Sequence, residues 1–71
     1  MAGSDIITLE YVELYDEIET DKAWCFRFDD DNAEERIWLP KSQVEDIRES
    51  VNEVDVPLWL VEAKELEDYA K

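Results

Sequence analysis

The chain carries nucleophilic side chains but no histidine that would activate them. It has one cysteine and no histidine among 71 residues, and cysteine and serine nucleophiles usually depend on a neighbouring base. Cys25 lies between Trp24 and Phe26, where a thiol behaves as a small buried apolar group. Ser42, two residues after Pro40, is suited to capping a turn. The sequence therefore predicts no nucleophilic catalysis.

Carboxylates offer two further kinds of chemistry, hydrolysis and metal binding. Glycoside hydrolysis uses two acids held across a cleft, but pairs arise by chance among 21 acidic residues, and so short a chain has little material for a supported cleft. The segment "DDDNAEE", residues 29–35, has oxygen ligands for calcium, yet it lacks the glycine and the distal glutamate of an EF-hand loop. We expect a solvated turn there, with no metal, no cofactor and no enzymatic activity.

Net charge is the strongest feature of the sequence. With 21 acidic and 7 basic residues the chain has a net charge of −14, and its pI is about 4.1. Nucleic acids and anionic membranes are bound by neutralising phosphates with lysine and arginine. The composition therefore disfavours both as direct partners and favours a basic protein.

The acids are spread over every segment of the chain and are not confined to a tail. Alternate residues of a strand lie about 6.6–6.8 Å apart on one face, a spacing comparable to that of neighbouring phosphates. Glu13, Glu17, Glu19 and Asp21 would share one face of a regular strand. Such a row could imitate a nucleic-acid backbone and occupy the basic groove of a nucleic-acid-binding protein.

The predicted partner-binding set combines this row with the acids of residues 29–35 and one tryptophan. Trp38 alternates with Ile37 and Leu39, so it falls on the opposite face of its strand. There it is either exposed as an apolar anchor or covered by a C-terminal helix against Trp59. The full set is Glu13, Glu17, Glu19, Asp21, Asp29, Asp30, Asp31, Glu34, Glu35 and Trp38.

Two other interpretations of the acidity stay open. The chain can be a general interaction module, such as an adaptor or an accessory subunit of a viral assembly held through Trp38 and the helix. Alternatively, the acidity can serve only solubility or adaptation to high salt, which four lysines and three arginines would fit.

Hydrophobic alternation and turn residues predict a β-rich chain that ends in a helix. Trp24, Phe26 and Phe28 share a face and are expected to build the core. A bulge near Tyr11 would turn both apolar sets of the first strand inward. The expected strands cover residues 6–15, 22–28, 35–39, 46–50 and 54–56, and the expected helix covers residues 57–70.

These elements predict a single α+β domain over residues 1–71. We expect a small curled antiparallel β-sheet of four or five strands over residues 6–56, barrel-like, with the C-terminal α-helix across its opening. Residues 1–5 are expected to be flexible. A single cysteine and no histidine provide neither a disulfide nor the usual zinc ligands. Without a signal peptide or a long apolar run, the expected location is the cytoplasm.

The hairpin region also resembles known sequences. "ETDKAWCFRF", followed by "IWLPKSQV" and "VPLWLVEAKEL", is similar to small proteins encoded by phages and prophages. In size and charge the chain also resembles the anti-CRISPR and DNA-mimic inhibitors of phages. This resemblance implies a viral setting and a target such as a Cas protein or a Cascade-like complex. Arg36 and Lys41 depart from a uniformly acidic hairpin.

Overall fold

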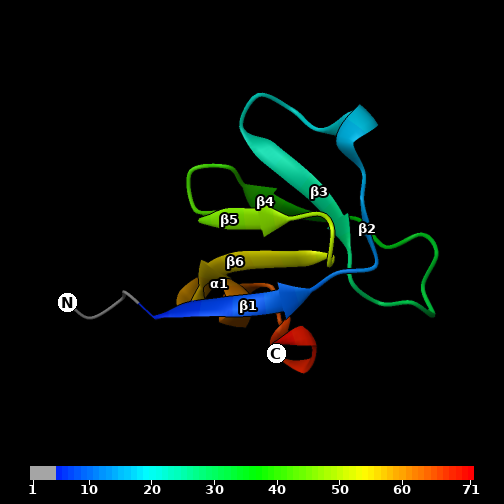
Figure 1. The fold of residues 1–71 in the computed structure, drawn as a ribbon. Coiled ribbons are helices and arrows are strands. Elements are labelled where there is room, and N and C mark those ends of the chain that lie inside the picture. The colour runs from blue at the N-terminus through cyan, green and yellow to red at the C-terminus, as the bar shows by residue number, and fades with distance from the viewer. Residues whose placement is uncertain (1–4) are drawn as a thin grey trace.

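The computed structural model describes residues 5–71 (Figure 1). The expected flexibility of residues 1–4 lies outside this range, and Asp5 is held by its carbonyl, which accepts a hydrogen bond from the Leu58 amide at 3.0 Å. The elements in chain order are β1 (Ile6–Glu10), β2 (Glu13–Leu14), η1 (Asp16–Ile18, a 3₁₀ helix), β3 (Ala23–Arg27), β4 (Ile37–Pro40), β5 (Asp46–Arg48), β6 (Glu53–Pro57), α1 (Leu58–Ala63) and η2 (Glu67–Tyr69, also 3₁₀).

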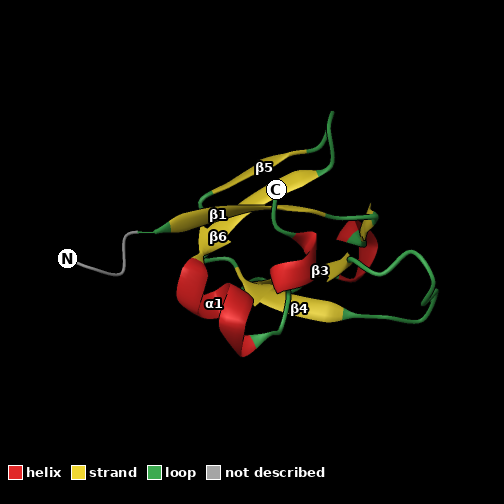
Figure 2. Cartoon of the chain, turned by 90° about the horizontal axis from the view of Figure 1, so that it is seen from below, coloured by secondary structure: helices red, strands yellow, loops and turns green. Residues whose placement is uncertain are grey.

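The strands form two antiparallel sheets, with the orders β1-β6-β5 and β2-β3-β4. Figure 2 shows the sheets as separate layers with α1 at one end. The predicted α+β class is confirmed at this level. The expected single barrel-like sheet of four or five strands is not what the structure has, since these six strands are divided between two three-stranded sheets.

The division occurs where the sequence predicts one strand with a bulge. The Tyr11 amide donates to the carbonyl of Asn52 at 3.0 Å, beside the first sheet, whereas the Val12 amide donates to Arg27 at 2.7 Å, in the second. Tyr11 itself is buried. Leu9, Tyr11 and Leu14 therefore all contact the core because the chain changes sheets, not because one strand bulges.

The first sheet separates apolar and polar side chains by strand parity. Leu9 of β1 pairs with Val54 of β6, and Val54 pairs with Ile47 of β5. Leu9 and Val54 are fully buried. Thr8 pairs with Asp55 in the alternate register, so the outer face of this sheet is polar.

In the second sheet the β3–β4 hairpin places Trp24 opposite Leu39 and Cys25 opposite Trp38. Phe26 and Leu39 are fully buried, as expected for this face. Trp24 is only half-buried, and it packs against this core from its margin. The Lys41 ammonium lies over the Trp24 ring, 4.3 Å from its centroid.

The C-terminal helix is much shorter than predicted. α1 ends at Ala63, and Glu65 has a positive φ of 58°. The Leu66 amide donates to Val61 at 2.9 Å and the Glu65 amide to Glu62 at 3.2 Å, which is the Schellman pattern that ends helices. Leu66 is buried. The turn that buries Leu66 therefore ends the helix before the predicted limit at residue 70.

The helix also faces the core with different residues from those expected. Leu60 and Val61 are buried, whereas Trp59 is 51% exposed. In the sequence, Trp59 begins an apolar series at helical spacing with Ala63, Leu66 and Ala70, which predicts an inward position for Trp59 that the structure does not have. Pro57 closes β6 and precedes α1 directly, and the helix that begins there packs Leu60 and Val61 into the core.

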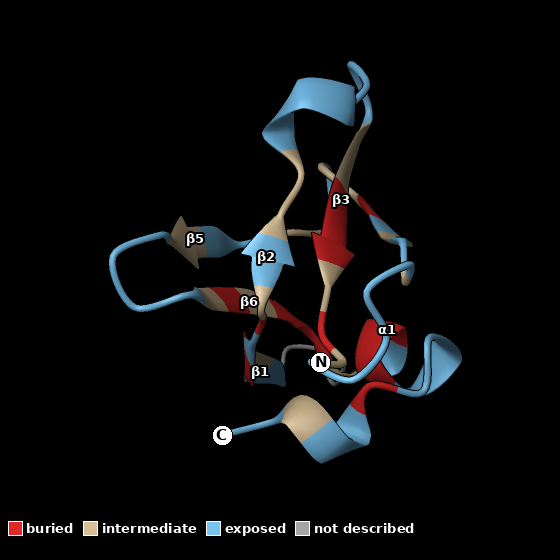
Figure 3. Ribbon diagram, turned by 90° about the vertical axis from the view of Figure 1, so that its right-hand side faces the viewer, coloured by how far each residue is buried: buried red, intermediate tan, exposed pale blue. Residues whose placement is uncertain are grey.

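One hydrophobic core joins both sheets and α1. In Figure 3 its buried residues are coloured red on β3, β6 and α1. Tyr11 and Phe26 meet edge to face at 5.0 Å, and Phe28 stacks on Tyr69 at 5.5 Å between ring centroids. The last residues lie along β1, where the Lys71 amide donates to Thr8 at 2.8 Å. Within residues 5–71 no helix is long and apolar enough to cross a membrane.

Candidate functional site: the acidic surface

The loop between β3 and β4, residues 28–36, is organised by one carboxylate. The Glu35 Oε1 atom accepts hydrogen bonds from the amides of Phe28 at 2.7 Å and Asp29 at 2.9 Å. Asp29 in turn accepts a bond from the Asp31 amide at 2.9 Å. Glu35 and Asp29 were both predicted to bind a partner. In the structure their carboxylates accept hydrogen bonds from the loop backbone.

The remaining acids of this loop are free for a partner. Asp30, Asp31 and Glu34 are exposed, and within residues 5–71 none of them forms an ion pair. The Asn32 side chain accepts from the Glu34 amide at 3.2 Å and so fixes the far side of the loop. In Figure 1 the loop extends away from both sheets. We call Asp30, Asp31 and Glu34 the acidic loop cluster.

The predicted row of four acids on one strand face is wrong. Glu13 lies on β2, Glu17 lies within η1, and Glu19 and Asp21 follow that 3₁₀ turn. The extended geometry ends at Tyr15, whose carbonyl accepts a hydrogen bond from the Ile18 amide at 3.3 Å. The regular spacing needed for a phosphate-like row is therefore absent between residues 13 and 21.

Two members of this row are also paired with cations. Glu13 lies 3.6 Å from a guanidinium nitrogen of Arg27. Glu19 accepts a hydrogen bond from the Lys41 ammonium, which also covers Trp24. Glu17 and Asp21 stay exposed. The row thus leaves two accessible carboxylates near η1, while the acidic loop cluster lies at the other end of β3.

The basic residues near the hairpin are engaged within the chain. Arg36 lies over the Tyr15 ring, 4.1 Å from its centroid. Arg27 donates its Nε hydrogen to the Tyr15 hydroxyl at 3.0 Å, and this bond raises the pKa of Arg27. Lys41 is held by Glu19. Arg36 and Lys41, which sequence reasoning placed as interruptions of an acidic face, are thus bound to partners of their own.

Trp38 is exposed to 37% on β4. Of the two predicted positions, the exposed one is therefore the position that the structure has. It pairs with Cys25 on the face opposite the Phe26 and Leu39 core. Cys25 is fully buried, and burial raises the pKa of its thiol, an effect that Arg36 partly offsets. Trp38 is therefore an accessible apolar side chain beside an inert cysteine.

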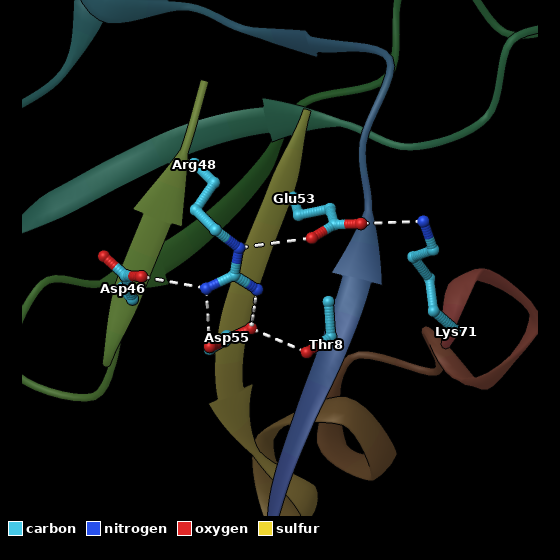
Figure 4. Close-up of polar contacts among 6 residues, drawn as sticks. All are labelled: Thr8, Asp46, Arg48, Glu53, Asp55 and Lys71. Carbon is cyan, nitrogen blue, oxygen red and sulfur yellow. Dashed lines mark hydrogen bonds and ion pairs between the residues drawn. The ribbon is translucent and has the colours of Figure 1, made fainter. Parts of the chain in front are cut away.

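Sequence reasoning missed an ion-pair network on the outer face of the first sheet (Figure 4). Arg48 of β5 contacts Asp55 through two nitrogens, at 2.8 and 3.1 Å. It also reaches Asp46 at 2.8 Å and Glu53 at 3.2 Å. Lys71 extends the network by binding the other oxygen of Glu53 at 2.7 Å. This arrangement holds three carboxylates around one guanidinium.

The network perturbs the ionisation of its members. Hydrogen bonds from Lys71 and then Arg48 lower the pKa of Glu53. The bond from Arg48 lowers the pKa of Asp55, with a smaller contribution from Thr8, which donates at 2.7 Å. The only sequence signal for the network was the spacing by two of its charged residues along β5 and β6, which puts each pair on one strand face.

Ion pairing leaves most of the negative charge unbalanced. Five acids form ion pairs within residues 5–71, and the other sixteen of the 21 do not. The five paired acids are Glu13, Glu19, Asp46, Glu53 and Asp55. In the same part of the chain, no three acids or cysteines gather closely enough to hold a metal ion.

Comparisons with protein-family models, curated proteins and solved structures find no significant match. The candidate surface is therefore defined by the distribution of charge and by the exposed aromatic side chains.

Proposed function

We propose that the chain is a non-catalytic inhibitor that binds the basic nucleic-acid-binding surface of a host defence complex. The observation that carries this proposal is the excess of carboxylates without ion pairs on so small a body. Sixteen acids within residues 5–71 make no ion pair, and they substitute for the phosphates that such a surface normally binds.

The acidic loop cluster is the centre of the proposed interface. Because Glu35 and Asp29 fix the loop backbone, Asp30, Asp31 and Glu34 present their charge on a preorganised segment. Preorganisation lowers the entropy that binding must overcome. A loop that keeps its shape is thus better suited to insertion into a basic groove than a disordered acidic tail.

Electrostatic steering follows from the same charge distribution. A net charge of −14 accelerates encounter with a cationic surface, and the rate falls as salt rises. The resemblance in size and charge to phage-encoded inhibitors supports a Cas protein or a Cascade-like complex as the partner, in the cytoplasm of the host cell. Nucleic acid and anionic membranes are not direct partners in this proposal.

Affinity capture with DNA as competitor tests the proposal. The tagged chain is incubated with lysates that contain candidate CRISPR complexes, with and without duplex DNA, and the bound proteins are identified. The proposal expects one nucleic-acid-binding complex that DNA displaces. Recovery of a partner that DNA leaves in place contradicts mimicry.

An adaptor or accessory subunit of a viral assembly is the second candidate function. Its specific support is the exposure of two tryptophans, Trp38 and Trp59, because buried aromatic anchors dominate many interfaces. For this function Trp38→Ala weakens binding more than charge reversal does, and the complex persists at high salt. Mimicry expects the reverse order.

A further inference from the structure

A hollow of about 440 Å³ lies where the β3–β4 loop, the β1–β2 junction, the β5–β6 turn and η2 meet. Its size falls within the range of small-ligand sites, about 300–1,000 Å³. The lining is both aromatic and acidic, a composition suited to an organic cation. The side chains that matter are Tyr11, Phe28 and Tyr69, together with Glu10, Asp30 and Asp68.

Tyr11 provides an unused polar group in this hollow. Its side chain is only 5% exposed, and its hydroxyl forms no hydrogen bond with residues 5–71. No buried side-chain oxygen or nitrogen among the described residues lacks a hydrogen-bond partner, so the Tyr11 hydroxyl is open to solvent and accessible to a ligand. Burial, and secondarily the charge of Glu49, raises the pKa of Tyr11. The hydroxyl thus stays protonated and can accept a hydrogen bond from an incoming N–H group.

The surroundings of Tyr69 show that the electrostatic potential in the hollow is negative. One face of its ring stacks on Phe28. Burial raises the pKa of Tyr69, and the carboxylates of Asp29, Glu35 and Asp68 raise it further. These acids lie on two separate segments, the β3–β4 loop and η2. Their combined field favours a cation beside the aromatic ring.

The chain itself places cations against aromatic rings: the Lys41 ammonium lies over Trp24, and two guanidinium groups meet at Tyr15. At Tyr15, the Arg36 guanidinium lies 4.1 Å from the ring centroid and Arg27 donates to the hydroxyl. The hollow repeats these ingredients, tyrosines and carboxylates, without a guanidinium. Lys71 also lines it, but its ammonium is bound to Glu53 on the outer face of the first sheet.

A guanidinium fits the hollow better than a metal ion or an ammonium. Within residues 5–71 no acids converge as metal ligands, and the three acids that line the hollow come from three separate segments. Arginine presents five N–H donors in a planar fork and stacks on aromatic rings, whereas lysine is a compact and strongly hydrated charge. Separated carboxylates beside tyrosine rings match the planar, multi-donor guanidinium of arginine better than the compact ammonium of lysine.

We propose that this hollow, lined by Tyr11, Tyr69, Glu10, Asp30 and Asp68, receives an arginine side chain of the basic partner. The inference rests on the proposed function, because it names how the cationic partner is recognised. Asp30 belongs to both surfaces, so the inserted arginine lies directly beside the acidic loop cluster.

An NMR titration with N-acetyl-arginine amide tests the inference without the partner. The resonances of Tyr11, Phe28 and Tyr69 are expected to shift in a saturable manner. The neutral isostere N-acetyl-citrulline amide is expected to bind at least about fivefold more weakly, and the lysine analogue also more weakly. Shifts spread evenly over all acidic segments, or equal binding of citrulline, overturn the inference.

Paired charge neutralisations provide the matched control. Asp30→Asn with Asp68→Asn is expected to weaken binding of the arginine amide about tenfold. Asp16→Asn with Glu45→Gln removes the same charge from exposed positions outside the hollow and is expected to change binding less than about twofold. Equal weakening by both pairs contradicts a site and indicates general attraction.

The two proposals fail in different ways. Loss of DNA competition in the capture experiment contradicts mimicry, whatever the arginine amide does. Failure of the arginine amide to shift the three aromatic residues contradicts the hollow alone, while DNA competition for the partner can persist.

Discussion

The Arg48 guanidinium donates two hydrogen bonds to the Asp55 carboxylate, with Nη2 2.8 Å from Oδ1 and Nη1 3.1 Å from Oδ2. This contact joins β5 to β6, and Thr8 extends it to β1 through the same carboxylate at 2.7 Å. All three strands of the first sheet are therefore tied together on their outer face, as Figure 4 shows.

Arg48→Met is expected to destabilise the protein in a pH-dependent manner. The pKa values of Asp55 and Glu53 are lowered from their ordinary 3.8 and 4.5. A lowered pKa in the folded state contributes stability above the unfolded pKa, and this stability is lost as pH falls through the folded value. The wild type should therefore melt a few degrees higher, about 2–5 °C, at pH 7.

The comparison uses urea and thermal unfolding of both proteins between pH 7 and pH 2.5. The difference in the free energy of unfolding between the wild type and Arg48→Met is expected to be constant above pH 5. It should shrink toward zero as the pH falls below the ordinary carboxyl pKa values. A difference that is the same at pH 7 and pH 2.5 contradicts the electrostatic origin and indicates lost packing of the arginine stem.

Thr8→Val tests the neutral member of the same network. Valine keeps the branched shape suited to a strand but removes the hydroxyl that donates to Asp55. The free energy of unfolding is expected to fall by about 1 kcal/mol, and the pKa of Asp55 is expected to rise. An unchanged carboxyl titration, followed by NMR, would show that the hydroxyl does not contribute.

Glu35→Ala should cost about 2 kcal/mol of stability, because two backbone amides lose a charged acceptor. Glu34→Ala is the matched control, since it removes the same charge from an exposed neighbour and should change stability by less than about 0.5 kcal/mol. Hydrogen exchange of the Phe28 and Asp29 amides should accelerate only in the first variant. Equal effects of both variants would rule out the loop-organising role.

Thermal melts at different salt concentrations separate mimicry from adaptation to high salt. Sixteen acids without ion pairs repel one another, so added salt should raise the melting temperature modestly, with most of the effect below about 0.2 M. The hydrophobic core that joins both sheets should keep the chain folded at low salt. A chain that folds only in molar salt would support the halophile interpretation instead.

Local patterns predicted the elements better than their assembly. Alternation identified the strand face that carries Phe26 and Phe28, and both are buried. It could not show that residues 6–15 divide between two sheets, because the division depends on long-range bonds from Tyr11 and Val12 to Asn52 and Arg27.

The predictions of a long C-terminal helix and of a row of four acids were wrong for related reasons. Apolar spacing suggested a helix to residue 70, but the left-handed backbone at Glu65 ends it early. Parity suggested four aligned acids, but η1 interrupts the strand. Which acids are used internally depends on tertiary contacts, such as Glu19 with Lys41, that sequence alone does not specify.

The most direct measurement of the mimicry claim compares two charge-reversed variants for affinity to the DNA-displaceable complex across a salt series. One variant reverses the acidic loop cluster by replacing Asp30, Asp31 and Glu34 with lysine. The control replaces Glu45, Glu62 and Glu67, which are exposed acids elsewhere on the surface. Mimicry through the loop predicts at least about tenfold weaker binding and a shallower salt dependence for the first variant only. Unchanged affinity after reversal of the loop cluster would contradict it.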